Sequence, residues 1–172
     1  MKYLIVSDIH GSVNSANIIK EKFETLKCDK ILLLGDILYH GPRNDLPLNY
    51  NPKKVISILN PLADKIIAVR GNCDAEVDQM VLDFKINDDY KLGKYYLTHG
   101  HHVNYEKPIK LETGSIVLHG HTHIIRKDVV EGVTYVNIGS ITLPKNNTKR
   151  CYGLLDEEGI KVFDLDDNLL LN

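Results

Sequence analysis

The chain has 172 residues, which is enough for one compact domain with a sizeable core and too few for two ordinary ones. Its hydrophobic content of 43% and charged content of 26% are those of a soluble globular protein. The formal net charge of −2 gives no electrostatic basis for broad binding to nucleic acid or to an anionic membrane. We therefore expect one domain over residues 1–172 that forms no stable complex with nucleic acid, although a few local groups could still bind a nucleotide.

The N-terminus and the cysteines bear on where the protein resides. The first apolar run is too short for a signal peptide, and no stretch is long enough to cross a bilayer. Cys28, Cys73 and Cys151 are far apart, odd in number and without a Cys-x-x-Cys pair. This pattern favours a reducing cytoplasm and argues against a disulfide framework or a thiolate zinc site.

Short apolar runs rich in β-branched residues predict five buried strands. Two amphipathic stretches, 12–27 and 51–62, predict helices between the first three strands. Strands that alternate with helices indicate a partly parallel sheet with helical cover. The predicted strands are residues 2–7, 30–35, 65–70, 94–99 and 114–120.

The second half of the chain has a different pattern. Residues 124–138 and 151–165 predict two hairpins, with turns at 131–132 and near 158–159. Several strands without long helices favour a second, largely antiparallel sheet packed on the first. We find no internal repeat and no linker.

Each of the five predicted strands is followed by residue types that bind metals. In an open α/β sheet the carboxyl ends of the strands form one edge, so we expect these five loops to converge. In chain order the residues are Asp8 and His10, then Asp36, then Asn72, then His99, and finally His121 and His123.

The number and type of these side chains predict a metal centre. Seven ligands are too many for one ion of four to six coordination, and they suit two ions about 3.5–4 Å apart that share a carboxylate. Oxygen and imidazole donors fit Mn, Fe, Zn or Ni and are too imidazole-rich for Mg or Ca alone. A single histidine after a strand is more often an ordinary hydrogen-bonded residue, and Gly-Asp and Gly-Asn are common turn pairs. The coincidence of all five loops favours the metal centre.

These motifs resemble those of the calcineurin-like metallophosphoesterases, and within them the small bacterial YfcE-type phosphodiesterases. The resemblance runs from Met1 to about Leu165. It implies an α/β (α+β) fold, a four-layer αββα sandwich of two mixed sheets flanked by helices. The motifs that carry it are "SDIHGS", "GDILYHGPRN", "AVRGNCDAEVDQM", "THGH" and "HGHTH".

The resemblance also implies how the ligands divide between two ions and what they do. Asp36 would bridge two divalent transition metal ions, commonly manganese, with nickel, iron and zinc as alternatives. The implied reaction is hydrolysis of a phosphodiester by attack of a metal-bridging hydroxide. One ion would be held by Asp8, His10, Asp36 and His123, and the other by Asp36, Asn72, His99 and His121.

Cys73 departs from the family pattern. Many members have Gly-Asn-His, whereas residues 71–74 here are Gly-Asn-Cys-Asp. A neutral thiol is a weak hydrogen-bond donor and carries no positive charge. Without the histidine, esters with poor alkoxide leaving groups should react slowly, which favours diesters over monoesters. A thiol nucleophile needs an activating base, and the nearby imidazoles are better explained as metal ligands.

The segment "HGPRN" at residues 40–44 supplies further candidates for substrate contact. Arg43 could bind phosphate oxygens in a bidentate manner, Asn44 could add a hydrogen bond, and His40 is the best candidate for protonating the leaving group. Asn72 and Cys73 would face the same substrate. The alternative is a proline-containing turn with a surface arginine, and the sequence alone leaves the two open.

Two other functions are compatible with the fold. One is phosphomonoester hydrolysis on a small metabolite or a phosphoprotein, which Cys73 disfavours. The other is a binding scaffold that has lost catalysis, as in the retromer subunit with this fold, which would not need all seven ligands. The physiological substrate, the metal used and the oligomeric state stay open. For Val77, Met80, Val81 and Leu82 we expect roles in the core or in contacts of a homo-oligomer.

Overall fold

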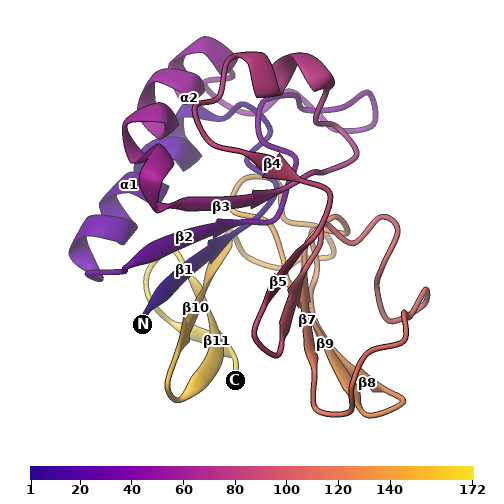
Figure 1. The fold of residues 1–172 in the computed structure, drawn as a ribbon. Coiled ribbons are helices and arrows are strands. Elements are labelled where there is room, and N and C mark those ends of the chain that lie inside the picture. The colour runs from indigo at the N-terminus through magenta and orange to yellow at the C-terminus, as the bar shows by residue number, and fades with distance from the viewer.

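Two β-sheets packed face to face form the framework of the chain, which the computed structural model describes from Met1 to Asn172 (Figure 1). Both α-helices, α1 (Val13–Thr25) and α2 (Pro52–Leu59), lie on the outer face of the first sheet. Two 3₁₀ helices, η1 (Asn60–Lys65) and η2 (Glu76–Met80), flank the third strand. No helix has the length and apolar character needed to span a bilayer.

The first sheet has seven strands, in the spatial order β12-β11-β10-β1-β2-β3-β4. Strands β1 to β4 are parallel, and β10 to β12 extend the sheet with antiparallel pairs. Their bounds are β1 (Tyr3–Val6), β2 (Lys30–Leu33), β3 (Ile66–Val69), β4 (Ile86–Asn87), β10 (Cys151–Asp156), β11 (Gly159–Asp164) and β12 (Leu169–Leu171).

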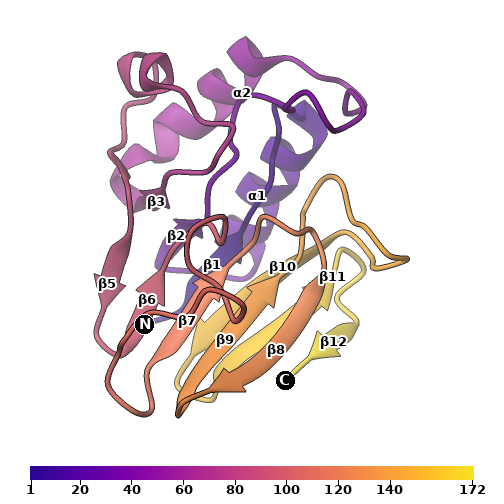
Figure 2. The same cartoon turned by 90° about the vertical axis from the view of Figure 1, so that its right-hand side faces the viewer.

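The second sheet has five strands, in the order β5-β6-β7-β9-β8, and it faces the viewer in Figure 2. Strands β6, β7 and β9 are parallel to one another, while β5 and β8 are antiparallel edge strands. Their bounds are β5 (Tyr90–Leu92), β6 (Tyr95–Leu97), β7 (Ile116–His119), β8 (Ile125–Val130) and β9 (Val133–Ile138).

Both predicted helices are present, and their ends follow from local chemistry. The side chain of Ser12 caps α1 by accepting from Ser15 N, and the side chain of Asn51 caps α2 by accepting from Lys54 N. Helix α2 gives way to η1 near Pro61, because proline has no backbone N–H to continue the helical bonds.

Residues of β1 and β2 alternate between two cores, as side chains of a strand must. Leu4 and Ile31 pack under the helices, while Ile5 and Leu32 pack between the sheets against residues such as Leu118. Each such side chain contributes about 1.5–3 kcal/mol when fully buried. These two cores fix the first sheet and its loops relative to the second sheet.

The predicted composition of the second sheet is wrong. The hairpin of β8 and β9 is in place, but the hairpin of β10 and β11 joins the first sheet, where Leu155 pairs with Tyr3 of β1. The second sheet is therefore mixed rather than largely antiparallel, and it includes β6 and β7. Hydrophobic patterning indicates which faces of a strand are buried, and it does not say which strand lies beside it.

The two mixed sheets confirm the predicted fold class. Over the outer face of the second sheet the covering layer is an extended loop rather than a helix. Val103 of this loop packs with Val117 and Tyr135 of the sheet, and Tyr105 and Ile109 lie against them.

Candidate metal centre

The loops that follow β1, β2, β3, β6 and β7 meet at one edge of the two sheets, and hydrogen bonds tie them together. The backbone N–H of Asp8 donates to Gly35 O at 3.1 Å, and that of His10 donates to Asp36 O at 2.9 Å. From the second sheet, His121 N donates to Asp8 Oδ2 at 3.1 Å. The predicted convergence therefore occurs, although the loops come from two sheets rather than one.

Five of the seven predicted ligands have a left-handed backbone, with φ between 51° and 70°. Residues other than glycine rarely adopt this conformation, and where they do the surrounding structure must hold them. The loops therefore bend sharply at the residues whose side chains they present. These residues are Asp8, His10, Asp36, His121 and His123.

Three of the predicted imidazole ligands are oriented by backbone carbonyls. In each ring Nδ1 faces a carbonyl oxygen, which can only accept a hydrogen bond, so Nδ1 carries the proton. In the neutral ring Nε2 is then unprotonated, and its lone pair is available to a cation. None of these acceptors is recognisable from the sequence, because every residue has a carbonyl. The pairs are His10 with Tyr39 O at 2.8 Å, His99 with Leu34 O at 2.6 Å and His123 with Leu143 O at 2.5 Å.

The Nε2 atoms of His10 and His123 lie 3.3 Å apart and both approach the carboxylate of Asp8. Asp8 Oδ1 is 3.2 Å from His123 Nε2 and 3.6 Å from His10 Nε2. This oxygen is buried and accepts no hydrogen bond. A buried carboxylate oxygen between two lone-pair nitrogens fits a bound cation, which satisfies all three acceptors at once.

Asp36 lies between this group and His99. Its Oδ2 is 3.7 Å from His10 Nε2 and 3.3 Å from His99 Nε2, and Asn72 Oδ1 is 3.1 Å from the same His99 nitrogen. Asp8, Asp36 and His99 form a second buried group whose ligand atoms could hold one ion. The position of Asp36 is the one that a bridging carboxylate requires; that it bridges two ions stays a prediction.

The pKa values at the centre show that it attracts positive charge. Burial alone would raise the pKa of Asp8, but His10 and His123 bring it well below its usual range. Burial would also raise the pKa of Asp36, but the neighbouring His99 lowers it below its usual value. Burial would lower the pKa of His99, yet Asp36 and Asp8 raise it to about 9. Protons and divalent cations therefore compete for the same positions.

His121 is placed differently from the other predicted ligands. Its ring centroid lies 5.1 Å from that of His99, and its side chain lines the pocket above the centre. Burial and the neighbouring His99 lower its pKa to about 4, so the ring is neutral and its lone pair is free for a cation.

Cys73 lies beside the centre but lacks what a nucleophile needs. Burial and the nearby Asp36 raise the pKa of its thiol to about 12. Its Sγ accepts from Asn72 Nδ2 at 3.3 Å, and a Cβ on Gly41 would come within 2.7 Å of it. Sγ also forms a group with His10 and Asp36 that could hold a metal.

Asp74 fixes the loop that carries Asp36. Its carboxylate accepts from Asp36 N at 2.8 Å, Ile37 N at 2.7 Å and Gly71 N at 2.7 Å. A Cβ on Gly71 would lie only 2.1 Å from Asp36 Oδ1, so the approach of the two loops requires glycine there. These contacts orient the loop of Asp36, while the next 3₁₀ turn is held by Asp78, which accepts from Ala75 N.

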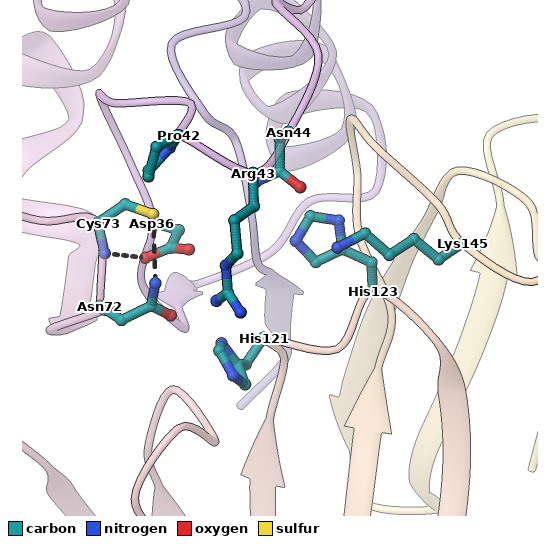
Figure 3. Close-up of a pocket in the computed structure, with 10 residues that line it drawn as sticks. Asp36, Pro42, Arg43, Asn44, Asn72, Cys73, His121, His123 and Lys145 are labelled. Atoms are coloured by element: carbon teal, nitrogen blue, oxygen red, sulfur yellow. Dashed lines mark hydrogen bonds between the residues drawn. The ribbon is translucent and has the colours of Figure 1, made fainter.

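A polar pocket of about 50 Å³ opens above the centre (Figure 3). The predicted substrate contacts Arg43, Asn44, Asn72 and Cys73 all line it. Sequence reasoning missed Lys145, which also lines the pocket and comes from the loop after β9. The one sequence feature that could have indicated it is that "NIGSITLPK", residues 137–145, ends in this lysine.

His40 is not among the residues that line this pocket. Its ring lies edge-on to those of Tyr39 and Tyr50, at centroid distances of 4.8 and 5.3 Å. Its Nδ1 is buried and has no hydrogen-bond partner. Its role as the proton donor to the leaving group stays a prediction.

Comparison with known proteins gives a consistent result. The calcineurin-like phosphoesterase superfamily domain matches residues 1–159. Phosphodiesterase YfcE of Escherichia coli (strain K12) is 39% identical over 176 residues, covering 99% of this chain and 96% of the relative. A solved structure of E. coli YfcE, described as a phosphoesterase, matches with a TM-score of 0.93, 40% identity and coverage of 99% and 97%. Vps29 of Entamoeba histolytica, at 20% identity, a TM-score of 0.63 and coverage of 100% and 97%, shares the fold.

Proposed function

This chain belongs to the calcineurin-like phosphoesterase superfamily and is a hydrolase of that family, and we propose that it hydrolyses phosphodiesters with the help of two divalent metal ions. The observation that carries the proposal is the unpartnered Oδ1 of Asp8, buried between the Nε2 atoms of His10 and His123. The near full-length relative named a phosphodiesterase supports the substrate class.

Seven side chains are proposed to hold the ions, with manganese as the proposed metal. The grouping of Asp8, His10 and His123 supports the first ion, and that of Asp8, Asp36 and His99 supports the second. The imidazole-rich ligand set favours a transition metal. In the full proposal Asp8, His10, Asp36 and His123 hold one ion, and Asp36, Asn72, His99 and His121 hold the other.

Bound divalent ions would supply a strong nucleophile from water at neutral pH and neutralise charge on the phosphoryl oxygens. The residues of this chain bind and orient the ester around them. Arg43 is proposed to contact two phosphoryl oxygens, and Asn44 and Asn72 to donate single hydrogen bonds. Asn44 is held for this by its own bond from Nδ2 to His40 O at 2.7 Å.

The pocket has no imidazole at the position of Cys73, and this supports the preference for diesters. A thiol with a pKa near 12 gives neither a positive charge nor a ready proton to a departing alkoxide. Aryl and other activated leaving groups depend less on such a proton. His40 remains the proposed donor, and His40→Gln should slow alkyl diesters more than aryl diesters.

Hydrolysis of bis(p-nitrophenyl) phosphate tests the proposal. Metal-stripped protein should be inactive, and added Mn²⁺ should restore turnover, with Ni²⁺, Zn²⁺ and Mg²⁺ as comparisons. Asp36→Asn should not recover, and Glu157→Gln, an exposed carboxylate at a hairpin turn, serves as the control. Absence of metal-dependent turnover in the unmodified protein would refute the assignment.

Location and assembly are proposed on less direct grounds. All three cysteines are free, and Cys28 and Cys151 are buried, which supports a cytoplasmic protein.

Leu82 lies in the core, whereas Val77 and Met80 of η2 are 57% and 82% exposed, which supports a homo-oligomer through η2.

A further inference from the structure

The pocket above the metal centre is too small for a whole phosphodiester. Its volume of about 50 Å³ holds a few water molecules or one phosphoryl group. A diester also carries two organic arms, and sites for such ligands usually measure roughly 300–1,000 Å³. At least one arm must therefore lie outside this pocket.

An open groove of about 320 Å³ adjoins the pocket and shares a wall with it. Residues 43–45 form one side of the groove and residues 142–145 form the other. Arg43, Asn44 and Lys145 line both spaces, so a ligand that leaves the pocket past these residues enters the groove.

The shared wall carries positive charge without a counterion. Arg43 and Lys145 form no ion pair with any carboxylate of the chain, including Asp45, the single acidic residue of the groove. Figure 3 shows the Arg43 side chain extending into the middle of the pocket toward His121, while Lys145 extends along His123. The unpaired ammonium group of Lys145 therefore suits a second anionic group, beside the one that Arg43 contacts in the pocket.

The backbone at Lys145 is fixed to the metal centre. Lys145 N donates to His123 O at 3.1 Å, and Lys145 O accepts from Thr148 Oγ1 at 2.7 Å. Thr142 Oγ1 donates to Ile9 O at 2.9 Å, next to the first ligands. The main chain of Lys145 is therefore bonded directly to the segment that carries His123.

We propose that Lys145 binds a second phosphoryl group, carried on the arm of the diester that lies in this groove, while Arg43 contacts the phosphoryl group at the metal centre. The inference rests on the proposed phosphodiesterase function. It narrows the substrates of the enzyme to diesters in which one arm, such as a nucleotidyl group, carries a further phosphate. A phosphate brings a charge of about −1.5 to −2 and three acceptor oxygens, which suit the unpaired ammonium group of Lys145. The polar pocket near His101 is a poorer place, because Asp88 and Asp89 line it.

Two chromogenic substrates test this. Thymidine 5′-(p-nitrophenyl phosphate) and its 3′-phosphorylated analogue share the leaving group and differ by the second phosphate alone. In the Mn²⁺-loaded protein the analogue should have a KM about tenfold lower, the effect expected of hydrogen bonds between charged groups. Lys145→Ala should reduce this preference to about twofold or less, and Lys145→Arg should keep most of it.

Lys110→Ala is the matched control, because Lys110 is an exposed lysine without an ion pair and lies outside the groove. The variant should keep the full preference. Equal KM values for the two substrates in the unmodified protein, or an undiminished preference in Lys145→Ala, would overturn the inference.

Binding gives a readout that does not depend on turnover. Calorimetric titration should show thymidine 3′,5′-bisphosphate binding about tenfold more tightly than thymidine 5′-monophosphate, with the difference reduced by Lys145→Ala and by added salt. If neither chromogenic substrate is hydrolysed, the proposed function is refuted, and the titration still shows whether the groove binds a second phosphate. If both are hydrolysed and bound alike, the groove proposal fails and the proposed function stands.

Discussion

The Nε2 atoms of His10 and His123 face each other at 3.3 Å, while Nδ1 of each ring donates a hydrogen bond to a backbone carbonyl. Two lone pairs at this distance repel unless a proton or a cation lies between them. Asp8 Oδ1 completes the group and has no other partner. A cation at this position would satisfy all three acceptors, so its binding should stabilise the folded protein.

Metal binding should stabilise the folded protein through Asp8. At free Mn²⁺ of 100 times Kd, linkage gives about 2.7 kcal/mol, or a rise in Tm of about 5–10 °C. Asp8→Asn should remove most of this rise, because the amide offers no charge to the cation. Differential scanning calorimetry with and without Mn²⁺ measures the shift.

Asp164→Asn is the control for that experiment. Asp164 is as deeply buried as the ligands, but it is bonded to Lys149 and to Asn168, away from the centre. The variant should start from a lower Tm and still gain the full shift with Mn²⁺. An undiminished shift in Asp8→Asn would contradict the assignment of Asp8 as a ligand.

Asp74 should control the metal centre without touching an ion. Asp74→Asn replaces a carboxylate that accepts three backbone N–H groups with an amide that has one acceptor oxygen. We expect a loss of about 1–3 kcal/mol in the free energy of unfolding and a 10- to 100-fold weaker metal affinity. Urea denaturation and metal titration measure the two effects.

Asp78→Asn provides the comparison, since Asp78 is also buried and accepts Ala75 N in the following turn. It should cost stability but leave metal affinity unchanged. Equal losses of metal affinity in both variants would show that Asp74 acts through general stability.

Cys73 should tolerate removal of its thiol. Cys73→Ala is expected to keep diesterase activity within a few-fold, because the thiol is a weak donor that is not activated as a nucleophile. Cys73→His should gain activity on alkyl monoesters such as glycerol phosphate, since an imidazole can protonate the leaving alkoxide. Complete loss of activity in Cys73→Ala would instead identify the thiol as a nucleophile.

Asp167 gives a pH dependence of stability that is separate from the metal centre. Its pKa is lowered by Lys22 and by Tyr152, whose Oη donates to it at 2.5 Å. A lowered folded-state pKa means that the stabilisation is present above the unfolded value of about 3.9 and is lost as pH falls through the folded value. The side chain is 56% exposed, so the effect is at most about 1 kcal/mol.

Urea denaturation of the unmodified protein and of Asp167→Asn at pH 6 and at pH 3 measures this effect. The variant should be less stable at pH 6, and the difference should shrink at pH 3. A difference of the same size at both pH values would show that the carboxylate charge is not involved.

Motifs predicted which side chains meet at the site, because each motif couples a strand end to a metal-binding residue type. Asp8, Asp36 and His99 could be identified in this way, and the structure brings them together. The carbonyls of Tyr39 and Leu143 could not, since their role depends on where distant loops cross. The sequence has no sign that marks one carbonyl among all the others.

The strand order and Lys145 were missed for a related reason. Alternation of apolar residues predicted buried strands at β10 and β11, but placed them in the second sheet, whereas β10 lies beside β1. Lys145 reaches the pocket because its backbone is tied to His123, 22 positions earlier in the chain. Contacts between residues so far apart in the sequence depend on the tertiary structure, which the local pattern of apolar and polar residues does not specify.

We propose that this chain binds two divalent ions through Asp8, Asp36 and the histidines around them. Titration of metal-stripped protein with Mn²⁺, followed by equilibrium dialysis and metal analysis, tests it most directly. We expect two ions per chain in the unmodified protein. Asp36→Asn should lose at least one ion and should also lose turnover of bis(p-nitrophenyl) phosphate. Binding of no ion, or unchanged binding of both ions in Asp36→Asn, would contradict it.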